Sequence, residues 1–153
     1  MRNQHHDTCS LCRVFVYGTL KRGQCRETCW PAEPISIHDA EVSGVLYDLG
    51  AFPGLQEGVG RVSGEVWEFA ADDMPTVLAA LDAIEGYSNS PTDLYRRVAK
   101  SVGLGNEEAI AWTYVLCCVP AGSPRVATVP ATWSGKCPRI SCDDQYDRGV
   151  IHG

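Results

Sequence analysis

Alternation of apolar and polar residues divides the first half of this chain into short strands separated by polar loops. Residues 14–17 are β-branched or aromatic and predict a buried strand, and residues 42–49 and 61–69 predict two more. The third strand has two distinct faces, one made of Val62, Gly64 and Val66 and the other of Trp67 and Phe69. Residues 24–39 are polar and interrupted by prolines, so we expect a long loop with at most a short helical turn, and residues 50–54 predict a turn.

A helix is expected over residues 73–85. Asp72 and Asp73 are suitable N-caps, Pro75 suits the first turn, and Gly86 is placed to end the helix in a left-handed conformation. The apolar residues recur at intervals of three and four and form one face, consisting of Met74, Val77, Leu78, Leu81 and Ile84. This face should pack against the strands.

Two further strands, 95–102 and 108–119, are predicted around the turn 103–106. Beyond Pro120 the chain is rich in Pro, Gly and Ser, and Trp133 is the residue there that we expect to dock firmly. About five strands with one or two helices indicate an α+β fold, a small mixed β-barrel that is closed or nearly closed, with a helix against it.

Composition limits the domain organisation and the partners. The 153 residues, 44% hydrophobic and 21% charged, suit one globular domain. We expect residues 13–140 to form that domain, with tails at 1–12 and 141–153. A formal net charge of −6 argues against a nucleic-acid surface. An apolar run long enough to span a membrane is missing, and the polar N-terminus lacks a secretory signal, so we expect a cytoplasmic protein that does not bind membranes.

Eight cysteines are many for a cytoplasmic protein of this size. The pairs Cys9/Cys12 and Cys25/Cys29 leave open a structural zinc site, although unequal spacing and the intervening strand favour ordinary reduced thiols. The adjacent pair 117–118 lies in an apolar strand pattern, where free cysteine behaves as a small buried hydrophobe. We therefore expect neither a metal nor a cofactor.

The segment from Tyr17 to Gly23, with the sequence YGTLKRG, follows the first strand directly. A strand that opens into a glycine-punctuated loop presents main-chain N–H groups that no ladder uses, and these can hold an anion. The alternative is that Gly18 and Thr19 serve turn geometry alone.

Glu85 is the candidate acid. It stands at the expected helix C-terminus, where the dipole and Asp82 one turn earlier both disfavour ionisation and raise the pKa of the carboxyl. If Ile84 and Tyr87 bury it, that pKa could approach neutrality, where a general acid/base works best. On the surface the same residue would have no function.

Several sequence segments occur in the order of a known family. VFVYGTLKRG at residues 14–23 is followed by LDAIEGY at 81–87, and the pieces GEVW at 64–67, YRR at 95–97 and AWTYV at 111–115 also match. In this combination, which runs from about residue 14 to residue 119, the chain resembles the γ-glutamylcyclotransferase-like (AIG2-like) family.

The resemblance implies a small β-barrel with flanking helices and a pocket beside the loop of Tyr17, Gly18, Thr19 and Leu20. In this family the loop holds the α-carboxylate of a γ-glutamyl substrate through main-chain groups, and the glutamate matched by Glu85 is the acid/base. Tyr95 and Tyr114 lie in matching segments and are candidates to line the pocket, or else they are ordinary core aromatics. The substrate-binding residues that the resemblance implies are therefore Tyr17, Gly18, Thr19, Leu20, Tyr95 and Tyr114.

The implied reaction is cyclisation of the γ-glutamyl group to 5-oxoproline with release of an amine or amino acid, without a cofactor. The alternatives are a non-catalytic member that binds a metabolite or a protein, and a zinc-stabilised interaction module. The sequence indicates neither the particular γ-glutamyl compound nor the oligomeric state.

Overall fold

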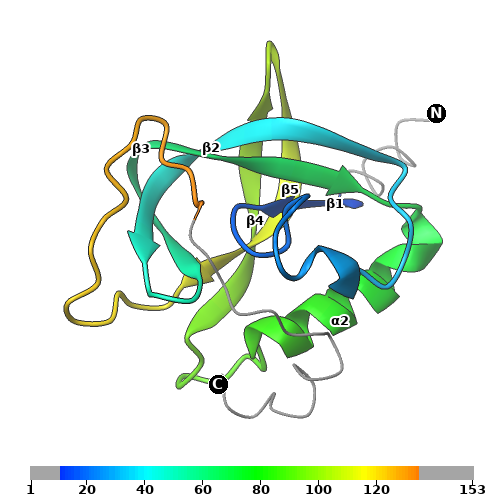
Figure 1. Ribbon diagram of the computed structural model, residues 1–153. Helices are drawn as coiled ribbons and strands as arrows, with labels where there is room; N and C mark the ends of the chain where they lie inside the picture. The colour runs from blue at the N-terminus through cyan, green and yellow to red at the C-terminus, as the bar shows by residue number, and fades with distance from the viewer. Residues whose placement is uncertain (1–10, 135–153) are drawn as a thin grey trace.

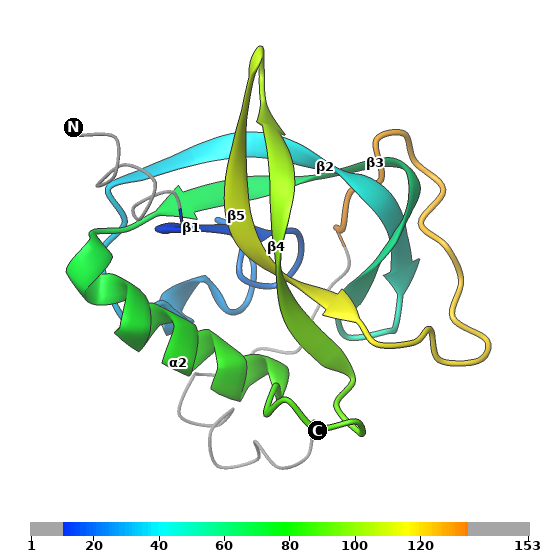
Figure 2. The same cartoon turned by 180° about the vertical axis from the view of Figure 1, so that it is seen from behind.

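The computed structural model describes residues 11–134 (Figure 1). Its elements, in chain order, are β1 (Arg13–Val16), η1 (Glu27–Cys29), β2 (Ser36–Asp48), β3 (Pro53–Glu68), η2 (Ala71–Asp73), α2 (Met74–Glu85), β4 (Tyr95–Leu104) and β5 (Glu107–Leu116). The long helix α2 lies along one side of the sheet, and the β4–β5 hairpin projects away from it (Figures 1 and 2).

The strands close into a barrel in the order β1-β3-β2-β4-β5. Neighbouring strands are antiparallel except for β1 and β5, which run parallel and complete the barrel where Val14 pairs with Trp112. The prediction of a small α+β barrel with a helix against it is confirmed.

Two hydrophobic clusters occupy the two faces of this sheet, because successive side chains of a strand point to opposite faces. One cluster draws residues from all five strands, including Phe15, Val42, Val66, Val102 and Val115, and fills the barrel. The other lies between the barrel and α2 and includes Val14, Val16, Trp67, Phe69, Met74, Val77, Leu81 and Ile84. The expected separation of Val62 and Val66 from Trp67 and Phe69 is therefore correct.

Gly64 permits the close approach of the end of β1 to its neighbour β3. A Cβ at this position would collide with the Val16 carbonyl oxygen and would lie 2.7 Å from Cζ of Phe15. Main chain cannot swing aside as a flexible side chain can, so the absence of a side chain here brings β1, and the loop that follows it, close to β3.

The boundaries of α2 agree with the sequence prediction. Gly86 has φ 70° and its N–H bonds back to the last turn, as expected of a left-handed C-cap. Asp73 occupies the N-cap position, but its side chain makes no capping hydrogen bond there, which differs from the expectation.

The strands β2 and β3 are longer than predicted, beginning at Ser36 and Pro53 instead of at 42 and 61. In contrast, β5 ends at Leu116. Cys117 and Cys118 are exposed, so the prediction that they are buried in a strand is wrong.

The segment after residue 120 packs along β2 and β3, with Val126 N–H bonded to Leu46 O and Ala131 N–H bonded to Arg61 O. Trp133 is 3% exposed and lies in the barrel cluster, as the sequence predicts. The predicted tail 141–153 and the domain end at 140 lie outside the described residues. Cys12, at the end of the other predicted tail, is buried and belongs to the cluster between the barrel and α2.

Candidate active site

The loop that leaves β1 is fixed from several sides. Within the loop, Lys21 N–H bonds to Gly18 O at 3.1 Å. The main-chain N–H and the Nε of Arg22 both donate to the nearly buried carboxylate of Glu65, each at 3.0 Å, and Lys21 Nζ donates to Trp133 O at 3.0 Å. These contacts hold residues 17–23 in one conformation.

Gly18 is required by close packing. A Cβ on Gly18 would come within 2.6 Å of the Pro53 ring. The loop therefore approaches the start of β3 more closely than any other residue type would allow.

The N–H groups at the start of the loop belong to Gly18, Thr19 and Leu20. Among residues 11–134, none of the loop's main-chain hydrogen bonds uses the N–H of Gly18, Thr19 or Leu20 as a donor. Adjacent N–H groups of this kind form a concave site for an anion.

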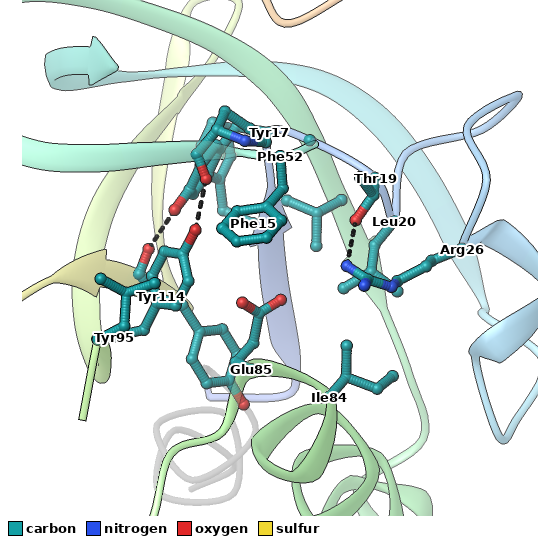
Figure 3. A pocket seen from close by; sticks show the side chains of 14 residues that line it. Phe15, Tyr17, Thr19, Leu20, Arg26, Phe52, Ile84, Glu85, Tyr95 and Tyr114 are labelled. Atoms are coloured by element: carbon teal, nitrogen blue, oxygen red, sulfur yellow. Dashed lines mark hydrogen bonds between the residues drawn. The ribbon is translucent and has the colours of Figure 1, made fainter. Parts of the chain in front are cut away.

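Glu85 reaches the same place from the end of α2. The helix stops at Glu85, and Tyr87 N–H bonds to Asp82 O at 2.8 Å, which turns the chain away from the helix axis. Figure 3 shows the Glu85 carboxylate between the rings of Tyr95 and Tyr114 on one side and Arg26 on the other. The acid and the loop thus face one cavity.

Burial raises the pKa of Glu85 from its ordinary 4.5 to about 7. The positive charge of Arg26 opposes this shift, and the negative charge of Asp82 adds to it. The sequence prediction had the correct direction and the correct acidic neighbour, while the largest cause, desolvation, comes from the tertiary structure. A carboxyl group with this pKa can both accept and donate a proton near neutral pH.

Asp82 is itself held by partners. Arg97 Nη1 donates to both of its oxygens, at 3.0 and 2.9 Å, and the Tyr114 hydroxyl donates to Oδ1. The Arg97 guanidinium also lies over the ring of Trp112, 5.0 Å from its centroid. This network anchors the end of α2 to β4 and β5, and thereby places Glu85.

The three predicted tyrosines all line the cavity, but each hydroxyl bonds to the protein. Tyr17 donates to Tyr114 O at 2.7 Å and accepts from Leu55 N–H at 3.2 Å, and Tyr95 donates to Pro53 O at 2.6 Å. Burial is the main cause that raises the pKa of all three, so they remain neutral. The hydroxyls of Tyr17 and Tyr95 bond to neighbouring strands, and that of Tyr114 bonds to Asp82 of α2, so all three hydroxyls serve to hold the cavity wall together.

All the residues singled out from the sequence, Glu85 and Tyr17, Gly18, Thr19, Leu20, Tyr95 and Tyr114, line one cavity (Figure 3). Ile84, which the sequence places next to Glu85, also lines the cavity. The sequence does not point to the other lining residues, which are Phe15, Val16, Arg26, Phe52, Pro53 and Leu94. Most of these are apolar and shield the acid. Arg26 adds a positive charge, and no motif of the sequence signals its position.

The cysteines do not form the zinc site that the spacing left open. Cys25 and Cys29 are both disulfide-bonded, so they are neither reduced thiols nor thiolate ligands in this structure. Cys9 lies outside the described residues, and within residues 11–134 no group of three or more metal-ligating side chains occurs. No helix in this range is long and apolar enough to cross a membrane.

Sequence comparisons identify relatives. A family model described as gamma-glutamyl cyclotransferase, AIG2-like, matches residues 14–134. A Vibrio cholerae protein named "Putative gamma-glutamylcyclotransferase" is 37% identical over 103 residues, which cover 67% of this chain and 79% of that protein. The gamma-L-glutamyl-butirosin B gamma-glutamyl cyclotransferase of Niallia circulans is 29% identical, over 67% of this chain and 65% of that enzyme.

Solved structures share the fold at lower identity. One titled "Gamma-glutamyl cyclotransferase" has a TM-score of 0.55 and 14% identity, covering 92% of this chain and 98% of its own. An uncharacterized protein from Pyrococcus horikoshii has a TM-score of 0.53 and 23% identity, covering 74% and 84%. By the family match over most of its length, this chain belongs to the AIG2-like gamma-glutamyl cyclotransferase family.

Proposed function

We propose that this protein converts γ-glutamyl compounds to 5-oxoproline, with Glu85 as the general acid/base. The observation that carries the proposal is that Glu85, with its pKa raised to about 7, faces the same cavity as the loop 17–20. The names of the relatives support the same class of substrate, including the γ-glutamyl-butirosin B of the Niallia circulans enzyme.

In the proposed reaction the nucleophile belongs to the substrate. Its α-amino nitrogen attacks the side-chain carbonyl carbon, a five-membered lactam forms, and the bond from that carbon to the leaving nitrogen breaks. Glu85 takes a proton from the attacking amine and returns it to the leaving nitrogen, so the products are 5-oxoproline and the free amine. The reaction as a whole therefore requires no water, external nucleophile or redox partner.

The loop would supply binding and orientation. The N–H groups of Gly18, Thr19 and Leu20 would hold the α-carboxylate, and this fixes the amine next to the carbonyl that it attacks. Holding a flexible chain in the geometry of ring closure contributes several kcal/mol to lowering the barrier, on the order of 7 or more in well-oriented cases. The mostly apolar lining limits the contact of Glu85 with water.

A direct assay tests this function. Purified protein is incubated with a panel of γ-glutamyl amino acids, amines and isopeptides, and 5-oxoproline is quantified against an enzyme-free control. We expect turnover of at least one class and a loss of several orders of magnitude in Glu85→Gln. If Glu85→Gln turns over at the wild-type rate, Glu85 is not the acid/base; if the wild type forms no product but binds γ-glutamyl ligands, the protein is a non-catalytic member of the family.

A further inference from the structure

Glu65 of β3 is a buried acid that the proposed reaction does not use. The residue is 8% exposed, and both of its carboxylate oxygens accept hydrogen bonds. Oε1 accepts from the main-chain N–H of Arg22 and from Nε1 of Trp67, and Oε2 accepts from Nε of Arg22, each at 3.0 Å. A carboxylate is tolerated away from water when it is paired and hydrogen-bonded in this way. Two of the three bonds go to one residue of the loop 17–23.

Glu65 is connected to both ends of the segment that contains the proposed carboxylate-binding groups. Its main chain pairs with Val16, the last residue of β1, in the register of β1 and β3. Its side chain holds Arg22, six residues further along the chain. Residues 17–21 lie between these two points, so a single residue of the neighbouring strand fixes where the segment begins and where it ends.

The carbonyl groups of the loop show how its peptide units are turned. Gly18 O accepts from Lys21 N–H at 3.1 Å, and Thr19 O accepts from the main-chain N–H of Arg26 at 2.8 Å. The C=O and N–H of a trans peptide unit point in opposite directions. The N–H groups of Thr19 and Leu20 therefore point away from the donors that hold these two carbonyls. Thr19 and Leu20 both line the cavity (Figure 3).

Two stacked tryptophans connect Glu65 to a third carbonyl of the loop. The ring of Trp67, which donates to Glu65, stacks on the ring of Trp30 with centroids 4.3 Å apart. Trp30 Nε1 in turn donates to Leu20 O at 3.0 Å. A loop held at this many points has little left to order when a ligand arrives, which favours binding.

We propose that Glu65 is a positioning residue: by holding Arg22, it keeps the N–H groups of the loop turned toward the α-carboxylate of the substrate. This inference rests on the proposed function, in which the loop binds that carboxylate. Glu65 itself does not line the cavity. Without its bonds the loop adopts several conformations, and binding then includes the cost of ordering the loop.

The charge of Glu65 separates this role from a simple electrostatic effect. Removing a negative charge near the loop would, by Coulomb's law alone, strengthen the binding of an anion. Loss of positioning has the opposite effect. In Glu65→Gln the amide NH₂ meets a donor of Arg22 or of Trp67, whichever way the amide is turned, so the bonds to the loop are broken. We therefore expect weaker anion binding in a protein that has become less negative.

Two small ligands test this expectation by titration of ¹⁵N-labelled protein followed by NMR. They are 5-oxoproline and 5-oxoprolinamide, which differ in having a carboxylate or a neutral amide. We expect the wild type to bind the acid more tightly by about 10- to 100-fold, the range of a hydrogen bond to a charged group, with shifts of the loop N–H signals. In Glu65→Gln this ratio should fall about tenfold, through loss of affinity for the acid, and the N–H of Arg22 should exchange faster with solvent.

Two further variants accompany Glu65→Gln. Asp39→Asn removes the same charge from the other partner of the Arg22 guanidinium, at a side chain 90% exposed, and should leave the ratio unchanged. Arg22→Lys keeps the charge and the main-chain donor but loses the Nε donor, and should give an intermediate ratio. Because the Arg22 side chain is 47% exposed, this variant decides the question if Glu65→Gln does not fold, and a wild-type ratio in it would then overturn the proposal.

Other results would also contradict the positioning role. An equal loss of affinity for both ligands in Glu65→Gln, with their ratio intact, would mean that Glu65 only stabilises the fold. Tighter binding of the acid would leave only the effect of charge, and a wild type without preference for the acid would remove the carboxylate site.

The titrations require no turnover, so they distinguish this inference from the proposed function. If the wild type makes no 5-oxoproline but its preference for the acid depends on Glu65, the proposed reaction is wrong and the positioning role is supported. If the wild type is active and Glu65→Gln keeps the wild-type ratio, the positioning role is wrong and the proposed function stands.

Discussion

The substitution Glu85→Gln should change how the stability of the protein depends on pH. In the folded protein the pKa of Glu85 is raised to about 7 from 4.5, chiefly by burial. The folded state therefore binds this proton more tightly than the unfolded state does. The stabilisation is fully present below the unfolded pKa and is lost as the pH rises through the folded pKa.

The size of this change in unfolding free energy follows from the shift in the pKa of Glu85. A difference of roughly 2.5 pKa units corresponds to about 3 kcal/mol, since one unit is about 1.4 kcal/mol. Glu85 is only partly buried in the cavity wall, and contact with solvent through the open side makes this an upper limit. Glutamine has nearly the same shape and no charge, so it keeps the packing and removes the titration.

The assay is urea unfolding of both proteins, followed by tryptophan fluorescence at a series of pH values from 4.5 to 8.5. The other carboxylates titrate in both proteins and cancel in the difference of unfolding free energies. As the pH rises across this range, we expect the unfolding free energy of Glu85→Gln to increase relative to that of the wild type by up to about 3 kcal/mol. Glu107→Gln, at an exposed position of β5, is the matched control and should show no such trend. A constant difference between Glu85→Gln and the wild type would refute the burial of an ionisable acid in this cavity.

Other substitutions test the surrounding structure and chemistry. Tyr17→Phe removes a buried hydroxyl that bonds to two main-chain groups, so urea unfolding should show a loss of about 1–3 kcal/mol; an unchanged midpoint would contradict those bonds. Gly64→Ala forces a Cβ into the Val16 carbonyl and should lower the unfolding free energy by about 1–3 kcal/mol, whereas a neutral result would refute this close approach of β1 to β3. Thr19→Ala leaves the main-chain donors in place and should reduce kcat/KM far less than Glu85→Gln; equal losses would assign the binding to the Thr19 hydroxyl. In the wild type, kcat/KM should rise with pH through about 7, as Glu85 loses its proton and becomes a base, and a profile flat from pH 5 to 8 would contradict that role.

Local signals in the sequence were sufficient for the core elements. The run from Val14 to Tyr17 and the spacing of apolar residues up to Gly86 determine β1 and α2 by short-range rules, and both lie where predicted. The alternation around Val62 and Val66 likewise assigned the faces of β3 correctly.

The extensions of β2 and β3 could not be found in this way. None of residues 36–39, the first four of β2, is buried, so hydrophobic periodicity is absent there. In β3, Gly54 and Gly58 suggest a turn, yet a Cβ on Gly54 would collide with Leu116 of β5, so this glycine serves packing between strands. Such contacts exist only once the barrel has closed.

Some features of the functional site are likewise predictable from the sequence, and others depend on the tertiary structure. Sequence motifs point to Glu85 and to the loop from Tyr17 to Leu20, but only the tertiary structure brings them to one cavity. Arg26 lies in an irregular segment whose position depends on Trp30 and on disulfide-bonded cysteines, and no spacing rule predicts where its charge ends up. The sequence wrongly predicts that Cys117 is buried in a strand, because the apolar run continues past Leu116, the last residue of β5.

The most direct test of the central claim is a product analysis of the reaction in ¹⁸O-labelled water. Attack by the substrate's own amine predicts unlabelled 5-oxoproline and free amine in equal amounts from the wild type, and neither above the enzyme-free rate from Glu85→Gln. Labelled glutamate in place of 5-oxoproline would mean that water is the nucleophile, and would contradict intramolecular cyclisation at this site.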